Sequence, residues 1–233
     1  MKKIFKNTFI SALSVILLLL IAPFIFKQKL IDASKEFINE QLVADVNFDE
    51  DLTSLSFLKS FPNVSLTLAN ISIVGRDSFA GDTLAFLPFF TTTFNIKSVF
   101  SDQINVSRLA LKEPEIRAKV LRDGKPNWEI WQTDTTRVDT AETTFALNLQ
   151  GVEIENGRLA YTDYSMGFLT VINGLNYEGK GDFTQDEFIL QNDLHASELT
   201  LEYGGIPWVY KAVIQTKISM GMNIPLVKIN WDS

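Results

Sequence analysis

Residues 89–97 read FFTTTFNIK, and the order of their side chains decides the fold class. Two sets of side chains alternate along this stretch, one of them mostly apolar: Phe90, Thr92, Phe94 and Ile96 alternate with Thr91, Thr93, Asn95 and Lys97. A period of two is typical of a β-strand with one buried face and one solvated face. Residues 64–68 and 115–120 repeat the pattern. The sequence therefore predicts a mainly β protein.

The strands are predicted to pair as an antiparallel meander. Strands buried on both faces in a parallel sheet read as continuous apolar runs, whereas these runs alternate. Turn signals separate them at short intervals, so we expect about a dozen strands joined in sequence order. Asn156-Gly157 lies between two alternating runs and predicts a two-residue hairpin. Further strands are expected through residues 208–218 and, last, at 227–231.

Residues 8–26, TFISALSVILLLLIAPFIF, form a long run without charge. At ~1.5 Å per residue, a helix of this length spans about 28 Å, close to the ~30 Å hydrocarbon core of a bilayer. A cleaved signal peptide has a core of roughly 7–15 residues and a small-residue cleavage site, and this run fits neither feature. We therefore predict an uncleaved membrane anchor over residues 1–29, built on Phe9, Ile10, Leu13, Leu17, Leu18, Leu19, Leu20, Ile21, Phe24 and Phe26.

The lysines around this run predict its orientation. Lys2, Lys3 and Lys6 precede it, and Lys27 and Lys29 follow it. Positive charge concentrates on the cytoplasmic side of membrane spans, so the N-terminus is expected in the cytoplasm. The chain would then be a single-pass protein of the inner membrane, with its body in the periplasm.

The rest of the chain divides by pattern. Residues 30–42 belong to an amphipathic stretch whose apolar side chains fall near one stripe, which predicts a short helix lying on the bilayer or packed against the body. Residues 43–131 are predicted to be a first β-domain. Residues 132–144, QTDTTRVDTAETT, are polar and predict a loop or linker. Residues 145–233 are expected to continue the strands.

Composition excludes some classes of function. Beyond residue 29 the chain carries 16 basic and 28 acidic residues, so a nucleic-acid surface, which needs clustered Lys and Arg, is not expected. The chain has no cysteine, which excludes disulfides, thiol catalysis and thiolate metal sites.

No motif predicts a reaction. His195 is the only histidine, and the acidic run at residues 49–51 is interpreted as a solvated surface. No glycine-rich phosphate loop follows a strand and opens a helix. We predict no catalytic residue, no metal site and no cofactor, and we expect a protein that binds or scaffolds rather than an enzyme.

Several short motifs follow one another in a specific order, and the more specific ones are Ser60-Phe61-Pro62-Asn63 and residues 123–128, DGKPNW. This order of motifs resembles the AsmA family of bacterial envelope proteins. The resemblance covers about residues 1–131. It implies a TamB-like repeating β-groove, in which a long antiparallel sheet curls around an apolar floor. It also implies a link to phospholipid movement between the two membranes and to outer-membrane assembly.

Two interpretations follow from these observations. In the first, the protein shields the acyl chains of membrane phospholipids, and the floor of its groove consists of Val64, Leu66, Leu68, Phe90, Phe94, Ile96, Ile116, Val120, Tyr210 and Ile214. In the second, the same alternation builds a closed β-sandwich without a lipid channel. The protein would then be a structural or assembly factor for outer-membrane proteins, with other envelope proteins as partners.

Overall fold

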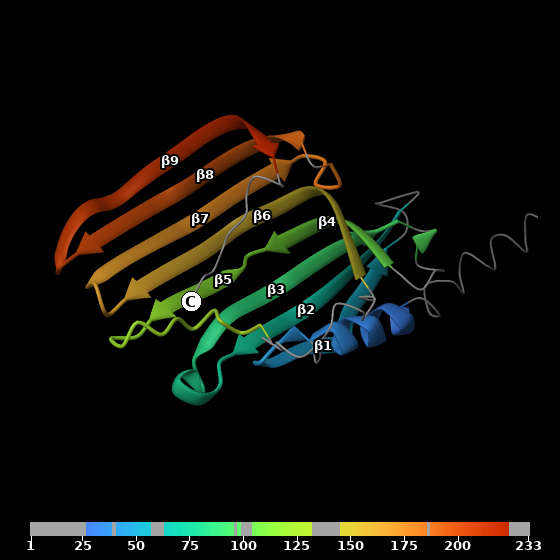
Figure 1. Ribbon diagram of the computed structural model, residues 1–233, viewed down its shortest axis with the longest axis horizontal. Helices are drawn as coiled ribbons and strands as arrows, with labels where there is room; N and C mark the ends of the chain where they lie inside the picture. The colour runs from blue at the N-terminus through green and yellow to red at the C-terminus, as the bar shows by residue number, and fades with distance from the viewer. Residues whose placement is uncertain are drawn as a thin grey trace, which may run out of the picture.

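The computed structural model describes residues 27–38, 41–56, 63–95, 97–98, 104–131, 145–185 and 187–223. Nine strands within this part of the chain form one sheet, which confirms the mainly β prediction (Figure 1). They are β1 (Asp45–Ser56), β2 (Val64–Val74), β3 (Thr83–Phe94), β4 (Ile104–Lys112), β5 (Glu115–Val120), β6 (Phe145–Asp163), β7 (Phe168–Lys180), β8 (Glu187–Tyr203) and β9 (Ile206–Asn223). A short 3₁₀ helix, η1 (Asp77–Phe79), lies between β2 and β3.

The sheet follows the chain almost in order. Its path is β1-β2-β3-β4-β6-β7-β8-β9, and β5 lies beside β3 and β6. β4 and β5 act as one interrupted strand, because both pair antiparallel with β3 and parallel with β6. Pro114 has no N–H to donate, and Glu113 adopts a positive φ of 53°. The interruption is bridged to β6 by hydrogen bonds of 2.7 Å from Glu113 N to Glu155 O and from Arg158 N to Pro114 O.

The predicted wholly antiparallel meander is wrong at β6. This strand runs parallel to β4 and β5, and the sheet is therefore mixed. A parallel pairing needs a crossover of a dozen or more residues, which the chain between Val120 and Phe145 supplies. The prediction failed because it took alternation to exclude parallel pairing, on the assumption that parallel strands are buried on both faces. Here the parallel strands β4 and β6 each have one solvated face.

The hairpin predicted at Asn156-Gly157 is also wrong. Both residues lie inside β6, which continues to Asp163. Asn156 has a positive φ of 51°, and the register between β6 and β7 shifts around Gly157. The dipeptide therefore forms a bulge in a long strand rather than a turn, because both strand halves keep β7 as their partner.

A row of such irregular positions crosses the sheet, and we call it the bulge line. It contains Asn70 in β2, Glu113 between β4 and β5, Asn156 in β6 and Gly174 in β7, all with φ between 51° and 59°. Asn156 N–H bonds to the Asn176 side chain across to β7, at 3.1 Å. Bulges bend a strand and increase its twist, so aligned bulges bend the sheet as a whole.

A helix at residues 27–38 packs against one end of the sheet. Leu30, Ile31 and Ala33 are buried, and Leu30 joins a core cluster with Leu66 and Phe94. The predicted amphipathic helix is therefore present in the described residues and packs on the body. Figure 1 shows this helix, in blue, beside the part of the sheet that contains β1 and β2. Lys35 and Glu50 form an ion pair of 2.6 Å between the helix and β1.

The predicted anchor lies almost wholly outside the described residues, which begin at residue 27. Among the helices that the structure does describe, none is long and apolar enough to cross a bilayer. The anchor over residues 1–29 and its orientation therefore stay predictions.

The two predicted β segments share the one sheet. β1–β5 lie within residues 43–131, β6–β9 lie within 145–233, and the two groups join where β6 pairs with β4 and β5. The polar segment 132–144 and the strand predicted at 227–231 lie outside the described residues.

Candidate functional site

Three rows of directly paired residues cross the sheet, and we call them rungs. The first rung runs through Leu55, Leu66, Thr92, Leu109, Val152, Gly179, Asn192 and Ile218. The second runs through Leu68, Phe90, Leu111, Ile154, Tyr177, Leu194 and Thr216. The third runs through Val46, Ile73, Ala85, Ile116, Leu159, Ile172, Leu199 and Ala212.

All three rungs lie on the same face of the sheet. Directly paired residues point to the same side, so each rung stays on one face from strand to strand. Leu66, Leu68 and Ile73 come from different rungs of β2, and all three pack in the same core cluster. We call this surface the apolar face, because most of its members are aliphatic or aromatic.

The bulge line places the second and third rungs on the same face of the sheet. From β2 to β8, the second-rung and third-rung residues of each strand are five positions apart, as Ile154 and Leu159 are in β6. Plain alternation would place residues an odd number apart on opposite faces. The bulge between them takes up one residue and returns the apolar side chains to the same side.

The two ends of the apolar face differ in how they are covered. The core cluster draws on the helix, on β1–β4 and on Leu149 of β6, and it contains no residue of β7, β8 or β9. On those three strands Gly179 and Ala196 are buried, most other members of the apolar face are half-buried, and Ile218 and Met220 of β9 are 49% and 42% exposed. Within the described residues, the apolar face over β7–β9 therefore lies outside the core cluster and is largely half-exposed.

The predicted floor residues fall into different environments. Val64, Leu66, Leu68 and Phe94 are at most 4% exposed within the core, and Phe90 packs against them. Ile116 and Ile214 are half-buried on the apolar face, and Val120 is buried near its edge. Tyr210 is 72% exposed and has no paired residue on β8. Ile96 lies outside the described residues.

Lipid contact by these ten residues stays a prediction, but the structure draws attention to others that sequence reasoning missed. Tyr177, Leu194, Leu199 and Ile172 lie on the open part of the apolar face. The sequence showed the alternation within each half of a strand. It did not show that the residues facing the apolar side change from odd to even positions, or the reverse, at the bulge line. On β9, Lys211 has a φ of 52°, so Val209 rather than Tyr210 pairs with Leu201.

The opposite face is polar and carries paired charges. Successive partners on it include Glu153, Glu178, Asp193 and Lys217. Ion pairs join this face at Arg108–Glu153 (3.8 Å), Lys112–Glu155 (3.3 Å), Lys180–Glu178 (2.6 Å) and Lys217–Asp193 (2.7 Å). A hydrogen bond from Lys217 to the Asp193 carboxylate, together with its charge, raises the pKa of that lysine. Exposed pairs of this kind contribute roughly 0–1 kcal/mol each, so this face is a solvated surface.

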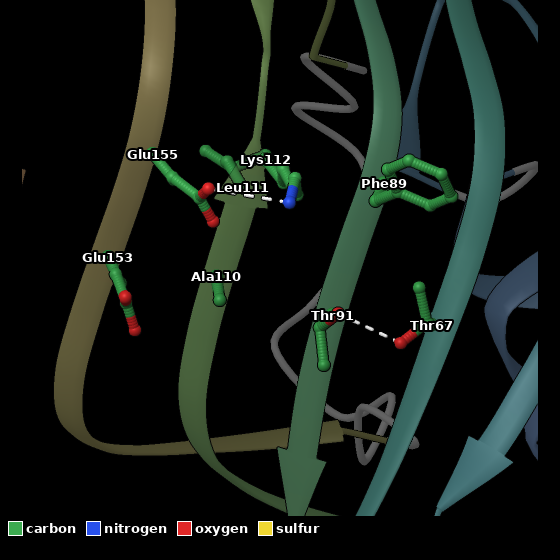
Figure 2. A pocket seen from close by; sticks show the side chains of 8 residues that line it. All are labelled: Thr67, Phe89, Thr91, Ala110, Leu111, Lys112, Glu153 and Glu155. Atoms are coloured by element: carbon green, nitrogen blue, oxygen red, sulfur yellow. Dashed lines mark hydrogen bonds and ion pairs between the residues drawn. The ribbon is translucent and has the colours of Figure 1, made fainter. Parts of the chain in front are cut away.

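A shallow depression of about 410 Å³ lies over β2, β3, β4 and β6, and all of its lining except Leu111 of the second rung belongs to this polar face. Figure 2 shows its lining: Thr67, Phe89, Thr91, Ala110, Leu111, Lys112, Glu153 and Glu155. The two threonine hydroxyls bond to each other at 2.8 Å, and the lysine pairs with Glu155. The threonines and the Lys112–Glu155 pair are thus engaged within the lining, while Glu153 pairs with Arg108 outside it.

The remaining candidates for chemistry are dispersed. His195 lies exposed on β8, between Asn176 of β7 and Gln215 of β9. Within the described ranges no group of three or more His, Cys, Asp or Glu side chains is placed to hold a metal ion. The acidic run at residues 49–51 forms part of β1, where the Asp49 carboxylate accepts bonds from the N–H groups of Asp51 and Leu52.

Comparison with known proteins agrees with the motifs and with the sheet. No curated protein and no solved structure matches the chain. The family model described as "AsmA family" matches residues 1–208, which include the helix and the strands through β8. Because that match covers most of the 233 residues, the chain belongs to the AsmA family.

Proposed function

We propose that this protein shields the acyl chains of phospholipids on its apolar face and contributes to phospholipid transport or to outer-membrane biogenesis. The observation that carries the proposal is the open apolar face over β7–β9, where rungs of apolar residues continue beyond the covered core. Membership of the AsmA family supports an envelope setting for this surface. An unbranched hydrocarbon chain is the ligand that matches a long surface made mostly of apolar side chains.

The hydrophobic effect supplies the energy for this binding. Exposing an acyl chain to water costs about 0.8 kcal/mol per CH₂, or roughly 13 kcal/mol for a sixteen-carbon chain. Contact with Ile172, Leu194 and Leu199 removes part of that cost while the headgroup stays in water. Such contacts have no preferred direction, so a chain can slide from rung to rung without breaking specific bonds. The role proposed is binding and transfer, not catalysis.

The proposed setting is the inner membrane, with the body in the periplasm. It rests on the apolar run at residues 8–26 and on the flanking lysines. The partners proposed are membrane lipids and, at the sheet edge, other envelope proteins.

A matched pair of neighbouring residues tests lipid contact. Ile172 and Val171 are adjacent in β7, but Ile172 lies on the apolar face, whereas Val171 pairs with Ala160 and Thr200 on the polar face. A photo-crosslinking amino acid is placed at each position of the full chain and irradiated in bacterial membranes. Phospholipid adducts, read by mass spectrometry, are expected at position 172 and not at 171. Equal yields at both positions, or none at either, would contradict the proposal.

An assembly factor is the second candidate, and the position of β9 favours it. β9 is the last strand of the sheet order, so one edge of its eighteen residues has no strand partner among the described residues. An open edge can accept a strand from another protein. In the same crosslinking experiment, a probe at Gln215 of β9 distinguishes the two functions. Protein adducts there, with no lipid adduct at position 172, would favour the assembly factor.

A further inference from the structure

Six large exposed side chains belong to two adjoining turns and the strand ends beside them, and we call this group the aromatic corner. They come from the turn after β6, the end of β8 and the start of β9, and each is between 50% and 72% exposed: Tyr164, Met166, Tyr203, Ile206, Trp208 and Tyr210. Isolated exposed apolar residues are ordinary, whereas several on adjoining segments suggest a contact surface.

The fold holds these side chains together through two adjacent turns. Asp163 accepts hydrogen bonds from the Ser165 hydroxyl at 2.6 Å and from Met166 N–H at 2.9 Å, which fixes the turn after β6. Gly204 N–H donates to Gly167 O at 2.9 Å, which joins that turn to the turn between β8 and β9. The corner is therefore a built feature, in which both turns are tied to one another.

The corner is continuous with the apolar face. Phe168, Tyr203 and Ile206 are successive paired residues on β7, β8 and β9. Tyr161 lies 5.9 Å from both Phe168 and Trp128, measured between ring centroids, so aromatic side chains extend along this rim. Between the third rung and the corner lies the pair Thr170–Leu201, in which the threonine hydroxyl donates to Thr200 O.

The chemistry of the corner fits the interfacial layer of a bilayer. Trp and Tyr present an apolar ring and a polar N–H or O–H, and they concentrate where hydrocarbon meets headgroups. Lys211 is paired with Glu198 at 3.4 Å, and it is the only basic residue in the described segments 163–168 and 201–212. Since the chain beyond residue 29 is strongly acidic, attraction to anionic headgroups is not the driving force.

We propose that the aromatic corner docks into the interface of a bilayer with zwitterionic headgroups, and that acyl chains pass there between the bilayer and the apolar face. The passage of lipid rests on the proposed function, whereas the docking itself does not. Docking places the open rungs next to the source of lipid, so that a chain moves from one apolar environment to another with little exposure to water.

The absence of cysteine from the chain makes a site-specific test clean. An environment-sensitive dye is attached to the full chain at Met166→Cys, and the protein is held in phosphatidylcholine nanodiscs and mixed with phosphatidylcholine vesicles. A quenching doxyl lipid is placed in the nanodiscs in one arm and in the vesicles in the other. We expect a blue shift and quenching in at least one arm. The same dye at Ser219→Cys, on the polar face of β9, should show neither effect.

A second pair of variants tests whether the corner itself carries the contact. Adding Trp208→Ser to the Met166 reporter should weaken quenching several-fold, while Trp131→Ser, which removes another exposed tryptophan, should leave it unchanged. Identical signals at positions 166 and 219 would overturn the proposal. Quenching that requires phosphatidylglycerol would also overturn it, as would a blue shift that grows with protein concentration without quenching, which would indicate a second copy of the chain.

Failure here and failure of the proposed function are distinguishable. A lipid adduct at position 172 without quenching at position 166 would leave lipid shielding intact and remove the docking corner. Quenching at position 166 without an adduct at position 172 would leave a membrane-docking protein that does not shield lipid.

Discussion

Asp163 shows how much of the corner depends on one residue. Its carboxylate accepts bonds from the Ser165 hydroxyl, from the N–H groups of Ser165 and Met166, and from the Tyr161 hydroxyl. The Ser165 hydroxyl bond, followed by the Met166 N–H bond, lowers the pKa of Asp163. Burial raises the pKa of Tyr161, and the Asp163 carboxylate adds to that rise. The charge on Asp163 therefore stabilises the turn.

The lowered pKa of Asp163 determines how the stability of the fold depends on pH. Because the folded state lowers the pKa of Asp163, its stabilisation is present above the unfolded value of about 3.9 and is lost as pH falls through the folded value. Asp163→Asn should lower the melting temperature at pH 7. The difference in melting temperature between this variant and the natural protein should become smaller below about pH 4. Thermal unfolding between pH 2.5 and 7 measures this. Asp123→Asn, in an exposed turn, is the control, and it should lower the melting temperature less than Asp163→Asn does. A constant difference at all pH values would contradict the assignment.

At the scale of elements, the bulge line determines which residues share a face. Gly174 in β7 has a φ of 59°, and a Cβ there would lie 3.0 Å from Ser197 Cβ and closer still to its hydroxyl. The bulge therefore brings β7 and β8 together more closely than a side chain allows. Without it, the third rung would turn to the polar face.

Gly174→Ala should therefore destabilise the sheet. A positive φ costs a non-glycine residue about 1–2 kcal/mol, and the contact with Ser197 adds to that. Gly221→Ala is the matched control, because Gly221 lies in β9 without a positive φ and has open space around it. Its effect should stay within about 0.5 kcal/mol. Denaturant unfolding of both full-length variants, followed by circular dichroism, compares them. Equal free energies of unfolding would show that the bulge is not under this constraint.

The helix at residues 27–38 is the element that closes the core. Leu30 is fully buried against Leu66 and Phe94, so Leu30→Ala should reduce the free energy of unfolding by about 2–5 kcal/mol. Gln28→Ala changes an exposed position of the same helix and should alter it by less than about 0.5 kcal/mol. The same denaturation measurement applies. A similar small effect for both variants would mean that the helix does not contribute to the core.

At the scale of the molecule, the sheet has a closed end and an open end. Helix and strands bury a core over β1–β4, while β7, β8 and β9 add no residue to it. The described residues form one layer of strands, so the closed-sandwich arrangement considered from the sequence is not what they adopt. A half-buried apolar face gains less from folding than a closed core, and the proposed apolar ligand would recover part of the difference.

The family motifs and the period of two were enough to establish the AsmA assignment and a mainly β body. Both are local properties, since the alternation of Phe90 and Phe94 with threonines is read within a few residues. The position of the helix near residues 30–42 followed from local spacing in the same way.

Tertiary structure alone decided the parallel pairing of β6, the conversion of Asn156-Gly157 from a turn into a bulge, and the burial of Leu66 beneath the helix. Each depends on a partner far away in the chain: β4 for β6, β7 for the bulge, and Leu30 for Leu66. The side on which an apolar residue lies depends on such long-range pairing, because one bulge reverses every later side chain of its strand. For that reason alternation identified the strands of this protein, but only the assembled sheet showed which apolar side chains remain uncovered.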